Sequence, residues 1–353
     1  DSHGWMAREF AIRFWDDSRI EAEADQDHAP TLCLRSPDAL TRMVQHPGEL
    51  GLSRAWVSGD LDVDGDLEQA LLRFNAWREN RMHISDLPKV MKTLKDSGVL
   101  KTERIPKPKS EIILGGSLHS LNRDRSAIQH HYDVSNRFYR MMLGPSMVYS
   151  CAYFKDEHES LEVAQERKLE LICRKLELEP GERFLDIGCG WGSLVVHAAK
   201  NYGVRATGVT LSQRQADYAR EWIAQEGLDS MCSIHLQDYR DIKDGPYHKI
   251  ASVGMFEHVG KRNLWLYLAR ASELLDYGGL FLNHGIVRTN PVRSSRHTFS
   301  KRFVFPDGEL STQGRVIQEF EDAGFELLDD ESLRPHYTVT LKRWAENMRE
   351  HQE

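Results

Sequence analysis

FLDIGCGWGS, residues 184–193, is an apolar strand that runs into a glycine-rich turn, and an amphipathic helix begins near Leu194. Glycines at 188, 190 and 192 allow the backbone to turn with positive φ and allow a ligand to approach the main chain. The stretch therefore predicts the first βα unit of a doubly wound sheet.

The spacing of the glycines bears on the ligand. A dinucleotide fingerprint is G-x-G-x-x-G, with an acidic residue about 20 positions further on. This chain has G-x-G-x-G, and the segment 210–213 after the second strand is TLSQ, without an acid. The sequence therefore lacks two features of an NAD-binding site. Asp186 at the strand end instead suits the ammonium and sulfonium of S-adenosylmethionine. A turn that binds nothing is the alternative.

From Ser126 onward, predicted strands alternate with predicted helices. The strands are 184–187, 205–211, 232–237, 249–255 and 279–286; the helices are 161–176, 194–202, 213–227, 262–275 and 312–323. This alternation predicts an α/β fold with a doubly wound, mostly parallel sheet of the Rossmann-like, class I methyltransferase type. Ligands then bind at the carboxyl ends of the strands.

Three parts of the chain differ in composition. Residues 1–87 are predicted to form a small α+β accessory domain, with strands at 8–15 and 31–35 and a helix at 67–79. Its turn DLDVDG, which is D-x-D-x-D-G at 60–65, matches half of a calcium loop. The twelfth position is Leu71 instead of Glu, so we predict an acidic turn and no metal. Residues 88–115 are predicted to be a basic linker, and 116–353 the S-adenosylmethionine-dependent methyltransferase domain.

Composition limits the class of protein. The chain has 353 residues, 40% of them hydrophobic, and a net charge of −8. These values favour two domains and argue against general nucleic-acid binding. No apolar run approaches the roughly 20 residues that span a bilayer, and no secretion signal is visible. Five scattered cysteines without a C-x-x-C motif favour reduced thiols in the cytoplasm.

Two basic segments stand out in this acidic chain. Residues 88–110 contain seven Lys or Arg against two acids, and 287–302 contain five Lys or Arg and no acid. Each basic residue near an anionic membrane contributes roughly 1 kcal/mol. We therefore expect peripheral contact with an anionic membrane, with an ordinary solvated linker and loop as the alternative.

Polar residues at two neighbouring strand ends predict the reactive site. Glu257 follows the strand 249–255 directly, and His284 occupies the equivalent place at the end of the next strand. A carboxylate and an imidazole in adjacent positions can hold an ion or act as a base. The histidines lack the spacing of a metal site, and Cys151 has no partner that would activate it, so an unreactive thiol is expected there.

Several motifs together resemble the cyclopropane fatty acid synthases, including the mycolic acid cyclopropane synthases. The resemblance covers about 120–350 and rests on HYD at 131–133, YSC at 149–151, LDIGCGWG at 185–192, VTLS at 209–212, GMFEHVG at 254–260, VFPDG at 304–308 and SLRPHY at 332–337. It implies methyl transfer from S-adenosylmethionine to a cis double bond in a phospholipid acyl chain. The resulting carbocation then loses a proton to a bound bicarbonate.

The resemblance also implies the site residues. The bicarbonate would be held by the backbones of Cys151 and Ile286 and by Glu257, His284 and Tyr337. Tyr132, and Phe305 after it, would face the cation with their rings. The cofactor residues implied by the motifs, together with those from the glycine turn, are Tyr149, Ser150, Asp186, Gly188, Gly190, Gly192, Thr210, Leu211, Gln215, Asp238 and Tyr239.

Other functions stay open at this point. A hydride shift in the same carbocation gives a 10-methylene fatty acid, the precursor of a methyl branch. Small-molecule N-methyltransferases share this fold and parts of these motifs, and a lipid-carrying partner without turnover is a further class. The predicted location is the cytoplasm, at the inner membrane surface, as a homodimer or with a partner subunit.

Overall fold

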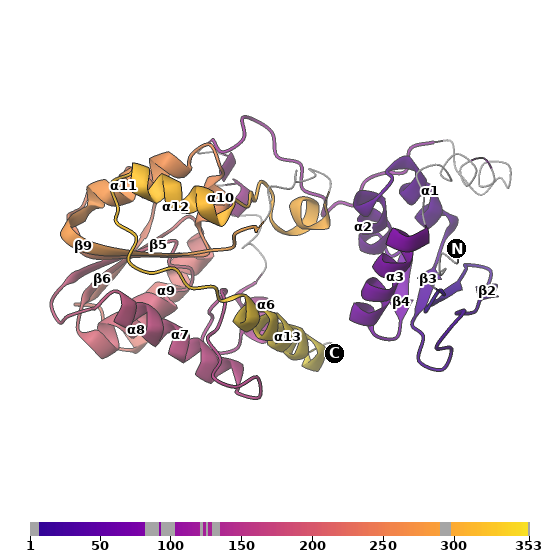
Figure 1. Ribbon diagram of the computed structural model, residues 1–353, viewed down its shortest axis with the longest axis horizontal. Coiled ribbons are helices and arrows are strands. Elements are labelled where there is room, and N and C mark those ends of the chain that lie inside the picture. The colour runs from indigo at the N-terminus through magenta and orange to yellow at the C-terminus, as the bar shows by residue number, and fades with distance from the viewer. Residues whose placement is uncertain are drawn as a thin grey trace, which may run out of the picture. The chain divides into compact units, whose positions relative to one another are not determined.

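The computed structural model describes residues 7–81, 92, 103–120, 123–124, 126–128, 135–289 and 298–351. The chain divides into two compact units (Figure 1). One contains residues 1–113 and 294–304, and the other contains 114–293 and 305–353.

The larger unit is built on a five-stranded parallel sheet in the order β7-β6-β5-β8-β9. The strands are β5 (Arg183–Ile187), β6 (Arg205–Thr210), β7 (Cys232–Leu236), β8 (Tyr247–Val253) and β9 (Leu275–His284). The strand order changes direction between β5 and β8, which is where an open α/β sheet binds its ligand. The predicted doubly wound, parallel fold is confirmed.

Helices cover both faces of this sheet (Figure 1). One face carries α7 (Leu161–Lys175), α8 (Ser193–Tyr202) and α9 (Gln213–Gln225), and the other carries α10 (Phe256–Val259), α11 (Leu264–Leu274) and α12 (Gln313–Asp322). The short 3-10 helix η2 (Tyr239–Asp241) follows β7, and α6 (Asn136–Leu143) packs against α13 (Arg334–Glu350).

Side-chain alternation in β5 produces the two cores. Phe184 packs among residues of α7 and α8, whereas Leu185 and Ile187 pack on the other face with α11. Serine caps start two of the three helices on the first face. Ser160 accepts a hydrogen bond from Val163 N–H at the start of α7, and Ser212 accepts one from Gln215 N–H at the start of α9.

The smaller unit has a four-stranded sheet in the order β2-β1-β3-β4. Its strands are β1 (Ala11–Arg13), β2 (Arg19–Ile20), β3 (Thr31–Leu34) and β4 (Leu61–Asp64), and its helices are α1 (Pro37–Gln45), α2 (Glu49–Val57) and α3 (Leu67–Arg81). The predicted strand 8–15 is therefore mostly loop. The carboxylates of the acidic turn pair with arginines, Asp60 with Arg42 and Asp62 with Arg35.

Two segments distant in sequence complete the smaller unit. Glu111 has a fully buried side chain that accepts two hydrogen bonds from Arg54 of α2, and Arg302 lies 4.0 Å away. Ile112 N–H donates to the carbonyl of Arg302, within the π-helical turn η3 (Ser300–Val304). Arg302 thus faces a carboxylate of its own unit. The boundaries 1–87, 88–115 and 116–353 stay a prediction, because most of 88–102 lies outside the described residues.

Some expected elements differ from the structure. The strand predicted at 249–255 ends at Val253, so Glu257 lies on α10 and not directly after the strand. Helices α1, α2, α6, α10 and α13 were not predicted. Within the described ranges, no helix is both long enough and apolar enough to cross a membrane.

Replacing Glu111 by Gln should destabilise the smaller unit by about 3 kcal/mol, because it leaves the buried Arg54 without its carboxylate. Urea unfolding measures the loss. Asp62→Asn is the matched control, since its ion pair with Arg35 is more exposed and should be worth less than about 1 kcal/mol. Equal losses of unfolding free energy in the two variants would contradict a larger contribution of Glu111 to the stability of the smaller unit.

Candidate active site

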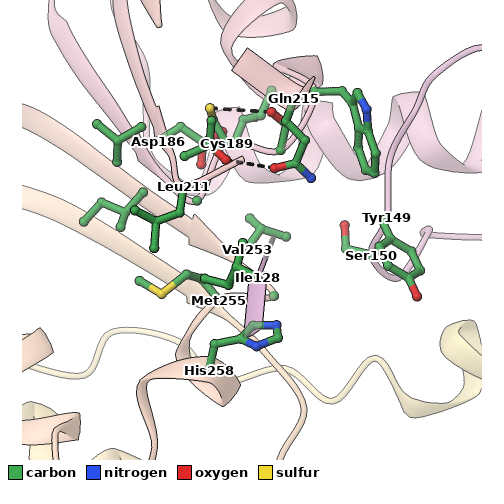
Figure 2. Close-up of a pocket in the computed structure, with 18 of the residues that line it drawn as sticks. Ile128, Tyr149, Ser150, Asp186, Cys189, Leu211, Gln215, Val253, Met255 and His258 are labelled. Atoms are coloured by element: carbon green, nitrogen blue, oxygen red, sulfur yellow. Dashed lines mark hydrogen bonds between the residues drawn. The ribbon is translucent and has the colours of Figure 1, made fainter. Parts of the chain in front are cut away.

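A pocket opens at the carboxyl ends of the strands of the larger unit. Figure 2 shows Tyr149 and Ser150 approaching it from the side opposite Leu211 and Met255. The predicted cofactor residues that line it are Tyr149, Ser150, Asp186, Gly188, Gly190, Thr210, Leu211, Gln215, Asp238 and Tyr239. Gly192 is not among the lining residues; it precedes the first residue of α8.

The glycine turn has the backbone that its sequence predicts. Gly188, Gly190 and Gly192 have φ of 83°, 55° and 88°. The N–H groups of Gly188 and Cys189 both donate to the carbonyl of Val209. A Cβ on Gly188 would lie 2.9 Å from Cγ of Met255, so a side chain here would be strained by φ and would crowd the pocket wall.

Two buried charged side chains form the floor of the pocket. Asp186 and Lys168 are both buried and both line it, and Lys168 Nζ donates to Ser150 Oγ at 2.9 Å. Burial raises the pKa of Asp186 to about 7 and lowers that of Lys168 to about 8, while each charge opposes the other's shift. Asp186 Oδ1 is buried and has no hydrogen-bond partner among the described residues. A cationic ligand would satisfy it.

Polar groups from the next two strands complete the pocket. Thr210, the last residue of β6, donates its hydroxyl to Gln215 Oε1 at 2.8 Å, which leaves the amide NH₂ of Gln215 for a ligand. Asp238, just after β7, accepts two hydrogen bonds from Arg240, both 2.7 Å long. The glycine backbone, a buried acid and these neutral and anionic groups fit a cofactor with an amino-acid part, a sulfonium and a ribose.

The segments that carry Glu257 and His284 adjoin each other beside this pocket. Val253 and His284 are register partners on β8 and β9, and Gly254 N–H donates to the carbonyl of His284. Glu257 Oε1 accepts a hydrogen bond of 2.7 Å from Ile286 N–H. Three of the predicted catalytic residues therefore lie together, although Ile286 uses its N–H for the carboxyl group.

Burial favours the neutral form of both groups. It raises the pKa of Glu257, against the effect of the Ile286 hydrogen bond, and it lowers the pKa of His284 to about 4. Glu257 Oε2 and His284 Nδ1 are buried atoms without a hydrogen-bond partner in the described part of the chain. A carboxylic acid and a neutral imidazole can together bind an anion that a carboxylate would repel.

Cys151 and Tyr337 lie next to this pair. Burial raises the pKa of the Cys151 thiol to about 11, as expected for an unreactive cysteine. The pKa of Tyr337 is raised by burial first and then by the charges of Glu257, Tyr149 and Cys151. Tyr132 lies outside the described residues. The ring of Phe305 is stacked at 6.4 Å from that of Tyr149.

Helix α13 fixes the backbone around Cys151. Thr340, a buried residue, accepts a hydrogen bond of 3.0 Å from Ala152 N–H, and His336 Nδ1 accepts one of 3.2 Å from Phe154 N–H. Tyr337 lies between these two contacts on the same helix. The sequence analysis missed this support because it did not predict the helix.

Lys168 was also missed, although the sequence contains a signal for it. The buried positions of α7 include Leu161, Ala164, Lys168 and Ile172, spaced three and four residues apart. A lysine in the apolar stripe of an amphipathic helix is unusual, because burying its charge is unfavourable unless a partner is present.

The fold and the pocket define a class I S-adenosylmethionine-dependent methyltransferase. The family model described as mycolic acid cyclopropane synthetase matches residues 119–353. The chain belongs to this family and is an S-adenosylmethionine-dependent methyltransferase of the cyclopropane-fatty-acyl-phospholipid synthase type.

Relatives in sequence and in structure support this family assignment. The chain is 42% identical to a probable fatty acid methyltransferase of Mycobacterium tuberculosis, over 93% of this chain and 79% of the relative. It is 36% identical to the cyclopropane-fatty-acyl-phospholipid synthase of Escherichia coli, over 89% and 75%. The cyclopropane synthase MmaA2 of Mycobacterium tuberculosis matches with a TM-score of 0.61 and 34% identity, over 64% and 84%. A mycolic acid cyclopropane synthase in complex with SAH and CTAB matches with 0.60 and 32%, over 65% and 84%.

Replacing Asp186 by Asn should weaken S-adenosylmethionine binding at least tenfold, because a cationic group of the cofactor loses its buried counter-charge. Calorimetry measures the affinity. Wild-type affinity should also rise between pH 6 and pH 8, since Asp186 ionises near pH 7.

Asp244→Asn is the control for this prediction. Asp244 pairs with Arg183 at the opposite end of β5, so its loss should leave cofactor affinity unchanged. An Asp186→Asn variant that binds the cofactor as the wild type does would contradict the role of Asp186.

Proposed function

We propose that this chain transfers the methyl group of S-adenosylmethionine to the cis double bond of an unsaturated phospholipid acyl chain and forms a cyclopropane ring. The observation that carries the proposal is the pair of buried, unpartnered atoms, Glu257 Oε2 and His284 Nδ1, beside the cofactor pocket. Such atoms are unfavourable in a folded protein unless a bound group satisfies them. A small oxyanion would do so, and bicarbonate fits this requirement.

The cofactor pocket would orient the methyl donor. Bound S-adenosylmethionine supplies an electrophilic methyl group. In this proposal Asp186 holds its ammonium, the amide of Gln215 and the glycine backbone hold the middle of the molecule, and Asp238 and Tyr239 lie near the adenosine. All of these residues except Gly192 line the pocket.

The substrate alkene would react through a carbocation. Its π electrons form the bond to the methyl carbon, and the other alkene carbon becomes positive. Aromatic rings stabilise such a charge by about 1–2 kcal/mol each where water is absent. Tyr149, Phe305 and Tyr337 can provide ring faces, and Tyr132 is proposed to do the same. Burial also excludes water, which would trap the cation as an alcohol.

The anion site would accept the proton. Bound bicarbonate supplies the base, and loss of a proton from the new methyl group lets the C–H electrons close the ring. Burial raises the pKa of Glu257 and so favours its protonated form, which can donate to an anion through Oε2. His284 Nδ1, the Tyr337 hydroxyl and the backbone of Cys151 complete the proposed site, and Ile286 acts by fixing the carboxyl group of Glu257.

The same carbocation can give a second product, which the same assay detects. A hydride shift before deprotonation leaves a methylene group, and both products gain one CH₂. The name of the 42% identical relative, a probable fatty acid methyltransferase, is compatible with either outcome. Small-molecule N-methylation would require an amine in place of the alkene.

The wild-type chain, incubated with S-adenosylmethionine and vesicles of oleoyl phospholipid, should give a product with cyclopropane ring protons in its proton NMR spectrum. Vinylic methylene signals without ring signals would establish the branched pathway instead. Methylation of an amine panel, with unchanged vesicles, would overturn the lipid substrate, and binding of lipid without methylation would indicate a carrier.

Two variants serve as controls in this assay. Glu257→Gln should lower the rate about 100-fold or more with little change in cofactor affinity, because it removes an acidic proton from the anion site. Glu273→Gln, a change at a more exposed carboxylate of α11, should have no effect. Depleting bicarbonate should lower the wild-type rate, and adding it back should restore it.

We also propose that the chain acts at the cytoplasmic face of an anionic membrane. Arg104, Lys107 and Lys109 are exposed on the segment 103–113. Arg293 and Arg296 of the second basic segment lie outside the described residues. Exposed basic groups attract anionic lipid, and salt screens this attraction over about 10 Å at 0.1 M.

Binding to vesicles with anionic lipid should therefore weaken as salt rises, and Lys107→Gln together with Lys109→Gln should weaken it at low salt. Co-sedimentation measures both effects. The control removes the same number of charges, by Arg205→Gln and Lys243→Gln, at the end of the sheet away from the pocket. Binding that is independent of salt would indicate apolar insertion.

A further inference from the structure

Glu309 braces the short helix that carries Glu257. Its backbone N–H donates to the carbonyl of Glu257 at 3.0 Å, and its carboxylate accepts a hydrogen bond of 3.1 Å from Lys261 N–H, just beyond the end of α10. A single residue therefore contacts both ends of this four-residue helix. These two contacts tie Glu309 to the segment that carries the Glu257 side chain.

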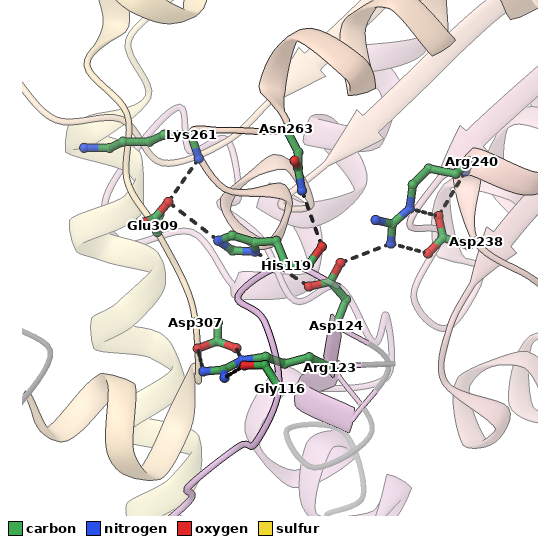
Figure 3. A network of polar contacts seen from close by, with 10 residues as sticks. All are labelled: Gly116, His119, Arg123, Asp124, Asp238, Arg240, Lys261, Asn263, Asp307 and Glu309. Carbon is green, nitrogen blue, oxygen red and sulfur yellow. Dashed lines mark hydrogen bonds and ion pairs between the residues drawn. The ribbon is translucent and has the colours of Figure 1, made fainter. Parts of the chain in front are cut away.

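His119 holds Glu309 from the other side (Figure 3). Its Nε2 lies 3.6 Å from Glu309 Oε2, its Nδ1 lies 3.6 Å from Asp124 Oδ1, and its side chain is 2% exposed. The proximity of these two carboxylates raises its pKa to about 9. Burial lowers the pKa of His258, on α10, to about 4, so this imidazole is neutral at pH 7.

The backbone is shaped to admit this imidazole. A Cβ on Gly260, which has φ of +77°, would lie only 2.1 Å from His119 Nε2. His119 itself has φ of +58°, an unfavourable conformation for a residue with a side chain, and Asn263 Nδ2 donates to its carbonyl at 3.5 Å. The end of α10 and the segment around His119 are therefore fitted to each other.

The same network extends into the cofactor pocket. Asp124, which binds one side of His119, accepts a hydrogen bond of 3.0 Å from Arg240, and Arg240 holds both carboxylate oxygens of Asp238. Asp124, Asp238 and Arg240 all line the pocket. Charges of alternating sign thus connect the pocket, through His119, to Glu309 (Figure 3).

We propose that His119 is a positioning residue for the deprotonation step: through Glu309 it fixes α10, and with it Glu257, relative to the cofactor pocket. This proposal rests on the proposed function, in which Glu257 helps to hold the base. His119 itself does not line the pocket and contacts no predicted catalytic side chain, so its effect passes through Glu309. A merely structural ion-pair network is the alternative.

The ion pair between Arg123 and Asp307 provides a matched control for the contact between His119 and Glu309. Arg123 forms a bidentate ion pair with Asp307, at 2.5 and 2.8 Å. This pair joins the same two segments as His119 and Glu309, but within the described part of the chain Arg123 forms its hydrogen bonds with Asp307 and the carbonyls of Leu114 and Gly116, and with no residue of α10. Asp307→Asn therefore tests whether joining the segments is sufficient.

The experiment measures kcat, KM for oleoyl phospholipid vesicles and cofactor affinity for wild type, His119→Gln, Glu309→Gln and Asp307→Asn. His119→Gln should lower kcat at least tenfold and change cofactor affinity less than threefold, and Asp307→Asn should keep kcat within threefold of wild type. The double variant His119→Gln/Glu309→Gln should be no slower than the slower single variant, because both act through one contact.

The pH profile provides a second readout. Wild-type kcat should fall as pH rises through about 9, where His119 loses its proton, and His119→Gln should lack this fall. The positioning role is overturned if His119→Gln retains full kcat, if Asp307→Asn loses as much, or if both proteins show the same alkaline fall. A wild type that methylates no lipid overturns the proposed function and this role together, whereas an active wild type with an active His119→Gln overturns this role alone.

Discussion

The change of strand order between β5 and β8 is the constraint on which the site depends. All strands of the larger sheet run parallel, so their carboxyl ends meet at one edge, and the helices leave in opposite directions at this point. The glycine turn and the buried Asp186 lie on one side of this point, and the ends of β8 and β9 lie on the other. Methyl donor and proton acceptor can therefore occupy neighbouring sites although they are held by different βα units.

Burial then determines the chemistry of these two sites in opposite ways. In the cofactor pocket, Lys168 and Asp186 moderate each other's pKa shifts. At the proposed anion site, burial raises the pKa of Glu257 and lowers that of His284 to about 4, which favours the neutral form of each. The cofactor pocket thus holds buried charged groups that suit a cationic ligand, whereas the proposed anion site holds groups whose neutral forms are favoured.

The sequence predicted the larger unit well because its signals are local. Strand periodicity and the glycine turn located β5 to β9 and the helices α8, α9 and α11 within a few residues. Helix α13 has a mixed surface with only Thr340 and Trp344 buried, so periodicity did not reveal it. Lys168 and His119 could not be assigned, because their partners Asp186 and Glu309 lie 18 and 190 positions away and meet them only in the folded chain. The motif residues were named through the family resemblance, and their individual roles stay predictions.

The smaller unit is discontinuous in sequence, and this affects how it can be made. Its buried Glu111 faces Arg302, and Glu49 of α2 accepts a hydrogen bond from Phe299 N–H. These partners leave the ribosome only after the five strands of the larger sheet have been synthesised. During translation the first 113 residues must therefore wait in an incomplete state while the larger sheet is being made. The part of the chain that is synthesised first is among the last to finish folding.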